Sequence, residues 1–510
     1  MSRDQEPAAA AELEGALAVF AAARGLFESL VGDLADRSAD CLTHGELEAM
    51  IGERGREVMR ELLQGHMDLR SIREPQLKQI TDADGVAHRR IEKNHQRLLA
   101  TVFGTVTVTR IAYRALGAAN LHPLDAHLNL PVERASHGLR RLAALEAVRG
   151  SFDDAKAAIA RASGTRVGKR QIEQLTVRTA VDVERFYRAA HPVPCTAENP
   201  LVISVDGKGI VMRPEALRQD TAKAAEAKGG NKMRTRLSGG EKLGRKRMAM
   251  LAAVYDAEAV PRTACDIISL ADEPDRTRAP GPRAFNKWLT GSVTDNTAEV
   301  VSAAFDQAEQ RDPRHERPWV VLVDGAAPQI EQILAEAKVR GVTVHIVCDF
   351  IHVLEYLWKA AWCFHAEAGA QIEAWIARHA RTILAGDSAQ VAAELKLAAK
   401  NASLSQEKTE TIKKVCTYLD NKHQYLRYDQ ALPRGWPIAT GVIEGACRHL
   451  VKDRLDITGA RWSLAGAEAV LKLRALISNG DFDTYFTWHL RQEHHRIHQT
   501  RYQDKLSLAA

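Results

Sequence analysis

The chain has 510 residues, of which 45% are hydrophobic and 26% charged, with 7 cysteines and a net charge of +5. This is the composition of an ordinary folded protein of several domains, and it excludes a chain that is disordered or fibrous throughout. Because 70 basic residues are balanced by 65 acidic ones, the charge alone does not indicate a nucleic-acid-binding protein. The cysteines form no C-x-x-C pair, so neither a disulfide framework nor a thiolate zinc site is predicted.

The sequence shows neither a membrane span nor a secretion signal. No run reaches the ~18 consecutive apolar residues of a membrane helix. The alanine-rich start contains Glu12 and Glu14 and follows Asp4 and Glu6, whereas a signal peptide has a basic lead and an uncharged core. We therefore expect a protein of the reducing cytoplasm that has no membrane partner.

The first part of the chain is predicted to form helices followed by a small β-hairpin. Apolar residues at three- and four-residue spacing indicate a helical region over 1–88. Over 89–132, two β-rich runs on either side of Gly104 predict a hairpin, and the Leu- and Pro-rich stretch 121–131 predicts a linker.

A helix-turn-helix pattern occupies 133–195. Ser151 is a good N-cap for one helix, a Ser-Gly-Thr turn ends it, and a helix rich in basic and amide side chains follows. The second helix of such a pair can enter the major groove of DNA, so we predict DNA contacts from Lys169, Arg170 and Gln174. A plain helical bundle explains this stretch nearly as well.

From 196 to 352 the pattern is that of an α/β core. A helix containing Trp288 is expected to run to about Gln310. Apolar and β-branched runs predict strands at 201–205, 248–255, 263–270, 319–323 and 342–347.

The remaining segments are predicted to be mainly helical. Helices fill 353–435, and two more, 440–454 and 463–476, lie in a last core segment, 436–478. The tail, 479–510, is polar. Because its histidines lack the ligand spacing of a zinc site, a surface helix or a frayed end is expected there; they are His489, His494, His495 and His498.

Two of the predicted strands end in the same way. One apolar run leads to Asp206-Gly and another to Asp324-Gly, at the sheet edge where ligands of α/β proteins bind. A single Asp-Gly is a common turn, but two in matching contexts favour a paired metal site. Glu444 lies in the first turn of a later helix, with Arg448 four residues on; taken alone, an acid placed for the helix dipole explains Glu444 better.

Carboxylates arranged in this way suit a hard divalent cation. Mg²⁺ takes oxygen ligands and keeps several waters. Two ions ~3.5–4 Å apart can activate the attacking oxygen and stabilise the leaving oxygen of a phosphodiester. Two strand aspartates and a helix glutamate that follows a long helical insertion resemble the RNase H-like nuclease core.

The same residues carry a family resemblance. Asp349 and His352, three residues apart, lie between Asp324 and Glu444 in the order found in the Mutator-like superfamily. From about residue 90 to residue 476, the chain resembles the DDE transposases of bacterial insertion sequences, in particular the Kra-type insertion-sequence family. The resemblance implies an α/β RNase H-like catalytic core with an all-helical insertion, preceded by mainly helical DNA-binding modules with a small β-hairpin.

The resemblance also implies roles and partners. Asp206, Asp324 and Glu444 would be catalytic and would hold two Mg²⁺ ions, for which Mn²⁺ could substitute. Double-stranded DNA, as terminal inverted repeats and as target, would be the partner of a homo-oligomer. Asp349 is an alternative to Asp324 as metal ligand. His352 would either help position the scissile phosphate or cap the following helix. Three tryptophans of the helical insertion are expected to pack in its core: Trp358, Trp362 and Trp375.

A basic segment separates the first two predicted strands. Between residues 228 and 247, eight basic residues face one acid, a net charge of +7 in a chain whose total is +5. A solvated loop is one explanation, but with DNA as the expected substrate we favour contact with its phosphates. Arg448 is included among the expected DNA contacts, and those of the segment are Arg234, Arg236, Arg245, Lys246 and Arg247.

The sequence thus predicts a nucleoid-associated bacterial transposase that cleaves DNA strands and transfers them. Two alternatives remain: a catalytically decayed, repressor-like DNA-binding protein, and an RNase H-like host nuclease.

Overall fold

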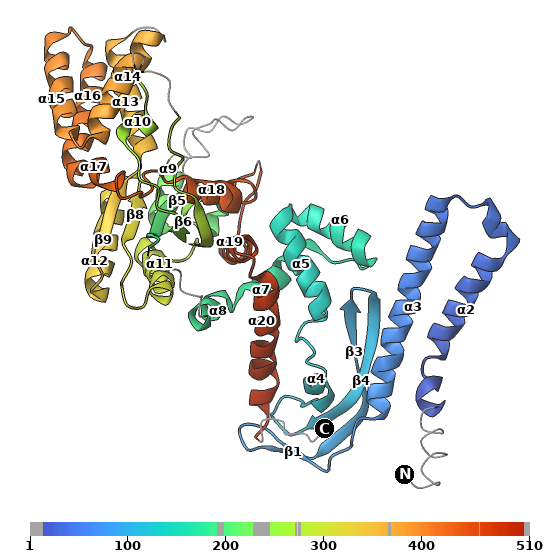
Figure 1. The fold of residues 1–510 in the computed structure, drawn as a ribbon. Helices are drawn as coiled ribbons and strands as arrows, with labels where there is room; N and C mark the ends of the chain where they lie inside the picture. Colours follow the sequence, from blue (N-terminus) through green and yellow to red (C-terminus); the bar gives the residue numbers. More distant parts are fainter. Residues whose placement is uncertain are drawn as a thin grey trace. The chain divides into compact units, whose positions relative to one another are not determined.

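The computed structural model describes residues 14–190, 198–227, 245–270, 273, 277–365, 369–457 and 459–503. The chain divides into two compact units, drawn in Figure 1. The first unit joins Met1–Asp182 to Asp483–Ala510, and the second is Val183–Phe482. Both termini of the chain therefore belong to the first unit.

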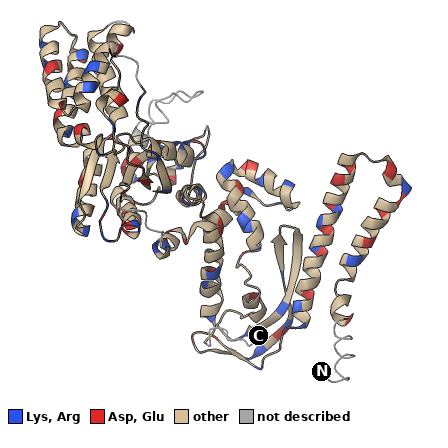
Figure 2. Cartoon of the chain, in the orientation of Figure 1, with Lys and Arg blue, Asp and Glu red and all other residues tan. Residues whose placement is uncertain are grey.

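The first unit opens with a helical hairpin of α2 (Ala21–Ala35) and α3 (His44–Ile72). A capping box between Thr43 and Glu46 satisfies backbone N–H groups at the start of α3. Figure 2 shows acidic and basic residues interspersed along both helices.

The predicted β-hairpin is confirmed, and the linker predicted after it is wrong. Strands β3 (Arg90–Thr101) and β4 (Gly104–Arg114) pair in antiparallel register, and Gly104 takes a φ of 129° at the turn. The segment expected as a linker contains the helix α4 (Pro123–His127), and three of its four leucines are buried. The Leu and Pro side chains of this segment pack in the hydrophobic core beside the hairpin, so their presence did not indicate a linker. The buried side chains include Leu121, Pro123, Leu124 and Leu130.

Three helices follow where the helix-turn-helix pattern was predicted: α5 (His137–Arg149), α6 (Phe152–Ser163) and α7 (Lys169–Ala180). Ser151 forms a capping box with Asp154, and Gly164 ends α6 in a left-handed conformation with φ 68°. Apolar residues of all three helices form one core cluster, which includes Leu139, Ile159 and Ile172.

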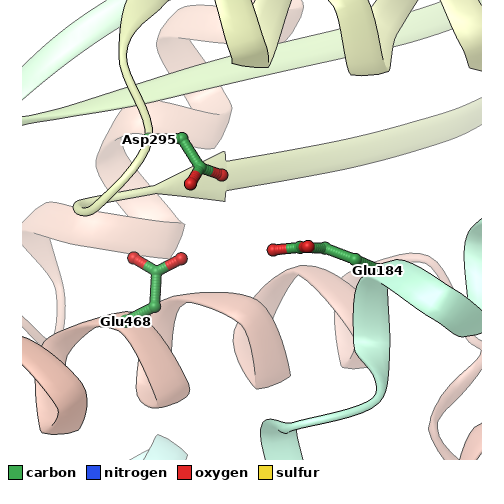
Figure 3. Close-up of side chains that lie close together, drawn as sticks. All are labelled: Glu184, Asp295 and Glu468. Atoms are coloured by element: carbon green, nitrogen blue, oxygen red, sulfur yellow. The ribbon is translucent and has the colours of Figure 1, made fainter.

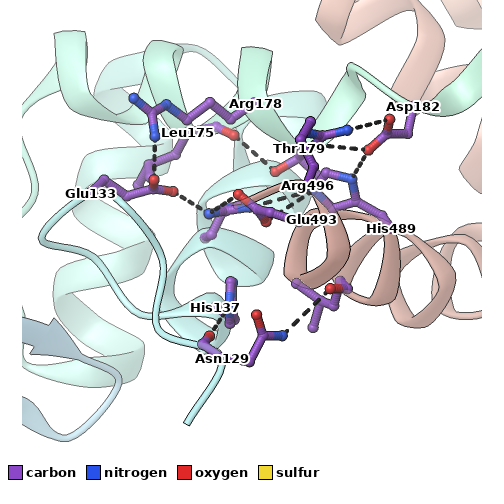
Figure 4. Close-up of polar contacts among 12 residues, drawn as sticks. Asn129, Glu133, His137, Leu175, Arg178, Thr179, Asp182, His489, Glu493 and Arg496 are labelled. Carbon is purple, nitrogen blue, oxygen red and sulfur yellow. Dashed lines mark hydrogen bonds and ion pairs between the residues drawn. The ribbon is translucent and has the colours of Figure 1, made fainter. Parts of the chain in front are cut away.

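The polar tail forms the helix α20 (Phe482–Ile497), one of the two forms expected for it, and from Asp483 onward it packs in the first unit. His489 is fully buried, and its Nδ1 lies 2.7 Å from Asp182 Oδ2 (Figure 4). Arg140, also fully buried, forms ion pairs with Glu133 and Glu493. The predicted helix is confirmed, but its surface location was wrong for His489, because polar side chains here are paired with one another inside the protein.

The Asp182 carboxylate makes the stability of this unit depend on pH. Burial raises its pKa, but hydrogen bonds from His489 and Arg496 outweigh burial and lower the pKa to about 2 from 3.8. A folded-state pKa below the unfolded value stabilises the fold above that unfolded value, and the stabilisation is lost as the pH falls through the folded pKa. We expect the free energy of unfolding to decrease by about 2 kcal/mol between about pH 4 and pH 2 through this group.

Thermal unfolding of the full chain across this pH range measures the effect. Asp182→Asn should flatten the decrease, whereas Asp153→Asn, which replaces an exposed carboxylate of α6, should not. Equal slopes for wild type and Asp182→Asn would contradict the assignment.

The second unit is built on a five-stranded mixed sheet with the order β7-β6-β5-β8-β9. The strand β6 pairs antiparallel with both β5 and β7, whereas β8 pairs parallel with both β5 and β9. The bounds are β5 Leu201–Val211, β6 Lys246–Ala257, β7 Ala284–Ser292, β8 Trp319–Val323 and β9 Val344–Cys348. The expected α/β architecture is thus present as a mixed sheet accompanied by many helices.

Two of the predicted elements in this region are wrong. The segment containing Trp288 is not a helix but the edge strand β7, which pairs with β6; the helix α11 (Thr297–Arg311) starts only later. The segment predicted as a third strand holds the short helix α10 (Ala264–Ile267), which Thr263 and Asp266 cap. In the first case pairing with a distant strand decided the structure, and in the second a local cap outweighed β-branched composition.

The predicted helical insertion contains α13 (Phe350–Phe364), α14 (Ala370–Leu384), α15 (Ser388–Asn401) and α16 (Gln406–Lys422), which pack together (Figure 1). Core packing was the wrong prediction for two of its tryptophans. Trp358 and Trp362 are 36% and 44% exposed, since they lie four residues apart on an outer face of α13. Trp375 is half-buried, with its ring 4.0 Å from that of His379.

Candidate functional site

Asp206 and Asp324 lie at matching positions of two neighbouring parallel strands. The paired part of β5 and β8 ends at Ser204 and Leu322. Each aspartate is two residues further along its strand direction, which places both at the same edge of the sheet. Asp206 is not at the end of a strand, as the sequence suggested, because β5 continues to Val211 in its pairing with β6.

The two Asp-Gly pairs have different structural causes. Gly325 has a φ of 97°, and an added Cβ would lie 3.1 Å from the ring of Tyr418 on α16. Gly207 lies inside β5, where an added Cβ would meet the Met248 side chain at 2.9 Å. The helical group thus reaches the loop of Asp324 through Tyr418, whose hydroxyl donates to the Asp324 carbonyl at 3.4 Å.

Glu444 is joined to the sheet edge by a hydrogen-bonding threonine. The Thr440 hydroxyl lies 2.6 Å from Asp349 Oδ2 and 3.2 Å from Glu444 Oε1. Thr440 directly precedes the helix α18 (Gly441–Ala446), which carries Glu444. A hydroxyl has one hydrogen, so it cannot donate to two ionised carboxylates. The shorter contact assigns the hydrogen to Asp349, and Glu444 then faces an oxygen lone pair, an arrangement that an added cation would stabilise.

Cys447 ties the same helix to Asp206. Its thiol donates to Asp206 Oδ2 at 3.2 Å and lies three residues beyond Glu444, where α18 continues as a turn of π-helix. Burial, together with the negative charges of Asp206 and Glu444, raises the pKa of this thiol, and Lys208 opposes the shift. The thiol therefore stays protonated and can donate to Asp206.

Asp349 and His352 lie at the start of α13. Asp349 is 1% exposed and is the N-cap, accepting a hydrogen bond from the Ile351 N–H at 2.9 Å. His352 therefore does not cap this helix, which excludes one of the two roles considered for it. Its side chain is 39% exposed, with Nδ1 4.0 Å from Glu355. Both carboxylates accept one backbone N–H, Asp324 from Ala326 at 2.8 Å, so their exposure separates them. Because Asp349 is buried whereas Asp324 is half-buried, the geometry favours Asp324 over Asp349 as a metal ligand.

The carboxylates of Asp206, Asp324 and Glu444 do not all come within 4.8 Å of one another. Ligands of one Mg²⁺ ion lie at about 2.0–2.1 Å from the metal and so close to one another. A pair of ions ~3.5–4 Å apart spreads its ligands further, so wider spacing suits a two-ion site better than a one-ion site. The donor set, which is all carboxylate oxygen, fits magnesium or manganese.

Among the described residues, one other group of acids has carboxylate oxygens within 4.8 Å of one another. It consists of Glu184, Asp295 and Glu468 (Figure 3). Lys472 already forms ion pairs with both Glu184 and Glu468, the latter at 2.9 Å. Glu468 also accepts the Ser292 hydroxyl at 2.7 Å and the Val293 N–H at 2.6 Å. We assign this group to holding the loop after β7, because Lys472 neutralises charge there and Glu468 accepts hydrogen bonds from that loop.

Only part of the basic segment, 245–247, lies within the described residues. Arg234 and Arg236 lie outside the described residues. Lys246 pairs with Asp456 at 3.3 Å, and the Arg247 guanidinium donates to the carbonyls of Val293 and Ala216 at 2.8 and 3.4 Å. The side chain of Arg247 thus has a structural use that the sequence did not reveal. Of the other expected DNA contacts in this unit, Arg245 is half-buried and Arg448 is 78% exposed.

In the first unit, the expected DNA-binding side chains lie on one exposed helix. Lys169, Arg170 and Gln174 are all exposed on α7, whose opposite face is buried against α5 and α6. Lys169 Nζ is 2.6 Å from Asp153 on α6, an exposed pair that costs little to open.

Comparison of the chain with protein-family models and with curated protein sequences finds no match. Within the described part of the chain, no helix combines the length and apolar character needed to cross a bilayer.

Proposed function

We propose that this protein is a DDE-type DNA transposase with an RNase H-like core. The observation that carries the proposal is that Asp206 on β5 and Asp324 directly after β8 lie at matching positions, with Glu444 near the same edge through the contacts of Thr440 and Cys447. The strand order, three antiparallel strands followed by two parallel ones, supports it, as does the helical group inserted between β9 and α18.

The residues of the site have separable tasks. Asp206, Asp324 and Glu444 would hold two Mg²⁺ ions, and Mn²⁺ could replace them. When bound, such ions activate the attacking oxygen and stabilise the leaving oxygen of a phosphodiester. The Cys447 thiol orients the Asp206 carboxylate through its hydrogen bond, and the Thr440 hydroxyl, which donates to Asp349, lies 3.2 Å from Glu444 Oε1. His352, partly exposed on the first turn of α13, is available to contact the scissile phosphate.

Cleavage of a duplex that carries the element's terminal repeat tests the proposal. With Mg²⁺ we expect strand nicks at the repeat end, followed by joining to a second duplex, and no cleavage of a scrambled duplex. Equal cleavage of both duplexes would instead support a host nuclease, and repeat binding without cleavage would support a decayed, repressor-like protein. The proposal includes a homo-oligomer on DNA and a nucleoid-associated, cytoplasmic location.

Recognition of the repeats is assigned to α7. We expect Arg170→Ala and Gln174→Ala each to weaken binding to the terminal repeat about tenfold, since a base contact is worth about 1–3 kcal/mol. Binding to scrambled DNA should change less. The measurement is titration of each duplex at a fixed salt concentration.

Arg161→Ala on α6 is the control, because it removes one exposed positive charge outside α7. If the α7 variants weaken repeat and scrambled binding equally, this helix does not read the sequence.

A further inference from the structure

A cavity of about 570 Å³ lies on the side of α18 that faces away from the acids. Thr440, Glu444 and Cys447 follow one another at spacings of four and three residues and so share one face. Gly441 and Gly445 share the other face and line the cavity. A Cβ added to either glycine would meet no atom within 4 Å, so the missing side chains leave this space open.

The cavity combines apolar walls with positive charge. Tyr255, Leu289 and Val442 are among its wall residues, and none of the described residues that line it is acidic. Two cations line it, Arg262 and Lys287. Apolar walls with a few convergent polar groups, at this size, are typical of small-molecule and cofactor sites.

Arg262 is the buried cation of the pair. It is 7% exposed, and its Nη2 donates to the Trp436 carbonyl at 2.5 Å. Its buried Nε has no hydrogen-bond partner among the described residues. Burial lowers the pKa of this guanidinium, and the Asp266 carboxylate offsets that only in part. This N–H is enclosed by protein atoms, so an anionic ligand in the cavity would be attracted by the positive charge of the Arg262 side chain that lines it rather than bind to Nε.

Lys287 is exposed on β7, and no hydrogen bond or ion pair joins its side chain to another described residue. Its ammonium is therefore available to a ligand. The neighbouring His449 is not, since its Nδ1–H donates to the Gly445 carbonyl at 3.0 Å and its Nε2 is hydrogen-bonded to Ser478 at 2.8 Å.

We propose that this cavity binds one nucleotide unit, with the phosphate at Arg262 and Lys287 and the base against the apolar wall. That the ligand is an anion follows from the cavity alone. That the nucleotide belongs to a DNA strand rests on the proposed function. A helix with its side chains is about 10–12 Å across. A strand held at the acids therefore passes the cavity within roughly three to four nucleotides at 3.4 Å each.

Binding of three probes in the presence of a chelator tests the proposal without engaging the acids: the oligonucleotide d(T)₄, thymidine 5′-monophosphate and inorganic phosphate. Lys287→Met removes the free cation, and Gly445→Leu fills the cavity without a backbone clash. We expect each to weaken d(T)₄ binding about tenfold, the loss typical of one charge-assisted hydrogen bond or of excluded contact area. Arg283→Met, an exposed cation just outside the cavity, should bind as wild type.

The outcomes separate the possibilities. If thymidine 5′-monophosphate competes with d(T)₄, the cavity binds any single nucleotide. If it does not compete but both variants still bind d(T)₄ more weakly, the cavity binds a nucleotide only as part of a strand. Inorganic phosphate that competes as well as the monophosphate, or variants that match Arg283→Met, would overturn the proposal. Asp206→Asn should bind all probes as wild type, so failure of the catalytic proposal leaves this result unchanged.

Discussion

Replacement of Asp206 by asparagine is expected to lower the rate of strand cleavage about 1,000-fold or more. The carboxylate is one of three that would hold the metal ions, and metal ions contribute several kcal/mol of transition-state charge stabilisation. About 4 kcal/mol corresponds to a factor of about 10³ in rate. Asparagine keeps the size of the side chain, so the loss reports on charge and ligand chemistry. Single-turnover cleavage of a repeat-ended duplex measures it.

Binding to the same duplex without metal should be unchanged in Asp206→Asn, because the proposed recognition helix belongs to the other unit. Glu258→Gln, which neutralises an exposed acid directly after β6, is the matched control and should cleave as wild type. Cleavage by Asp206→Asn at the wild-type rate would disprove the assignment of the acids.

The second large effect is expected on stability. Arg140→Ala removes a guanidinium that is 0% exposed and leaves the carboxylates of Glu133 and Glu493 without it. Breaking a buried ion pair by removing one partner costs about 3–5 kcal/mol. For a unit of this size we expect the Tm of the first unit to fall by about 10 °C. Calorimetry of the full chain resolves the transition.

Arg141→Ala is a stringent control, since it removes the neighbouring guanidinium on the same helix. Arg141 forms an ion pair with Asp483, with side chains 44% and 79% exposed. Exposed pairs contribute about 0–1 kcal/mol, so the Tm should change little. Equal losses in the two variants would show that the buried pairs are not what stabilises the unit.

The sequence predicted best where a local pattern and its structural cause coincide. The strand β8 was placed over Trp319–Val323 as found, because five consecutive apolar residues followed by Asp-Gly suit a strand buried on both faces. Ser151 and Gly164 bounded α6 correctly, since capping chemistry is local.

Prediction failed for elements and side chains whose structure depends on residues far away in the sequence. The strand β7 depends on β6, and the burial of His489 depends on Asp182, 307 positions away along the chain. For the acids, the sequence supplied the residue types and the repeated Asp-Gly. It gave no sign that Thr440 and Cys447 join Glu444 and Asp206 to the rest of the site. Their positions, four residues before Glu444 and three after it on one helix face, were the available signal.

The return of α20 to the first unit has a consequence for synthesis of the chain. The ribosome completes Met1–Asp182 first, but the partners of Arg140 and Asp182 on α20 emerge only after all of Val183–Phe482. At roughly 5–20 residues per second, that delay is about 15–60 s. The unit with the acids can therefore finish folding while the first unit still lacks a helix. A chain that stops short of α20 would keep the acids but leave Asp182 without His489 and Arg496, and Arg140 without Glu493. The unit that carries the proposed recognition helix α7 would therefore be complete only after translation of α20.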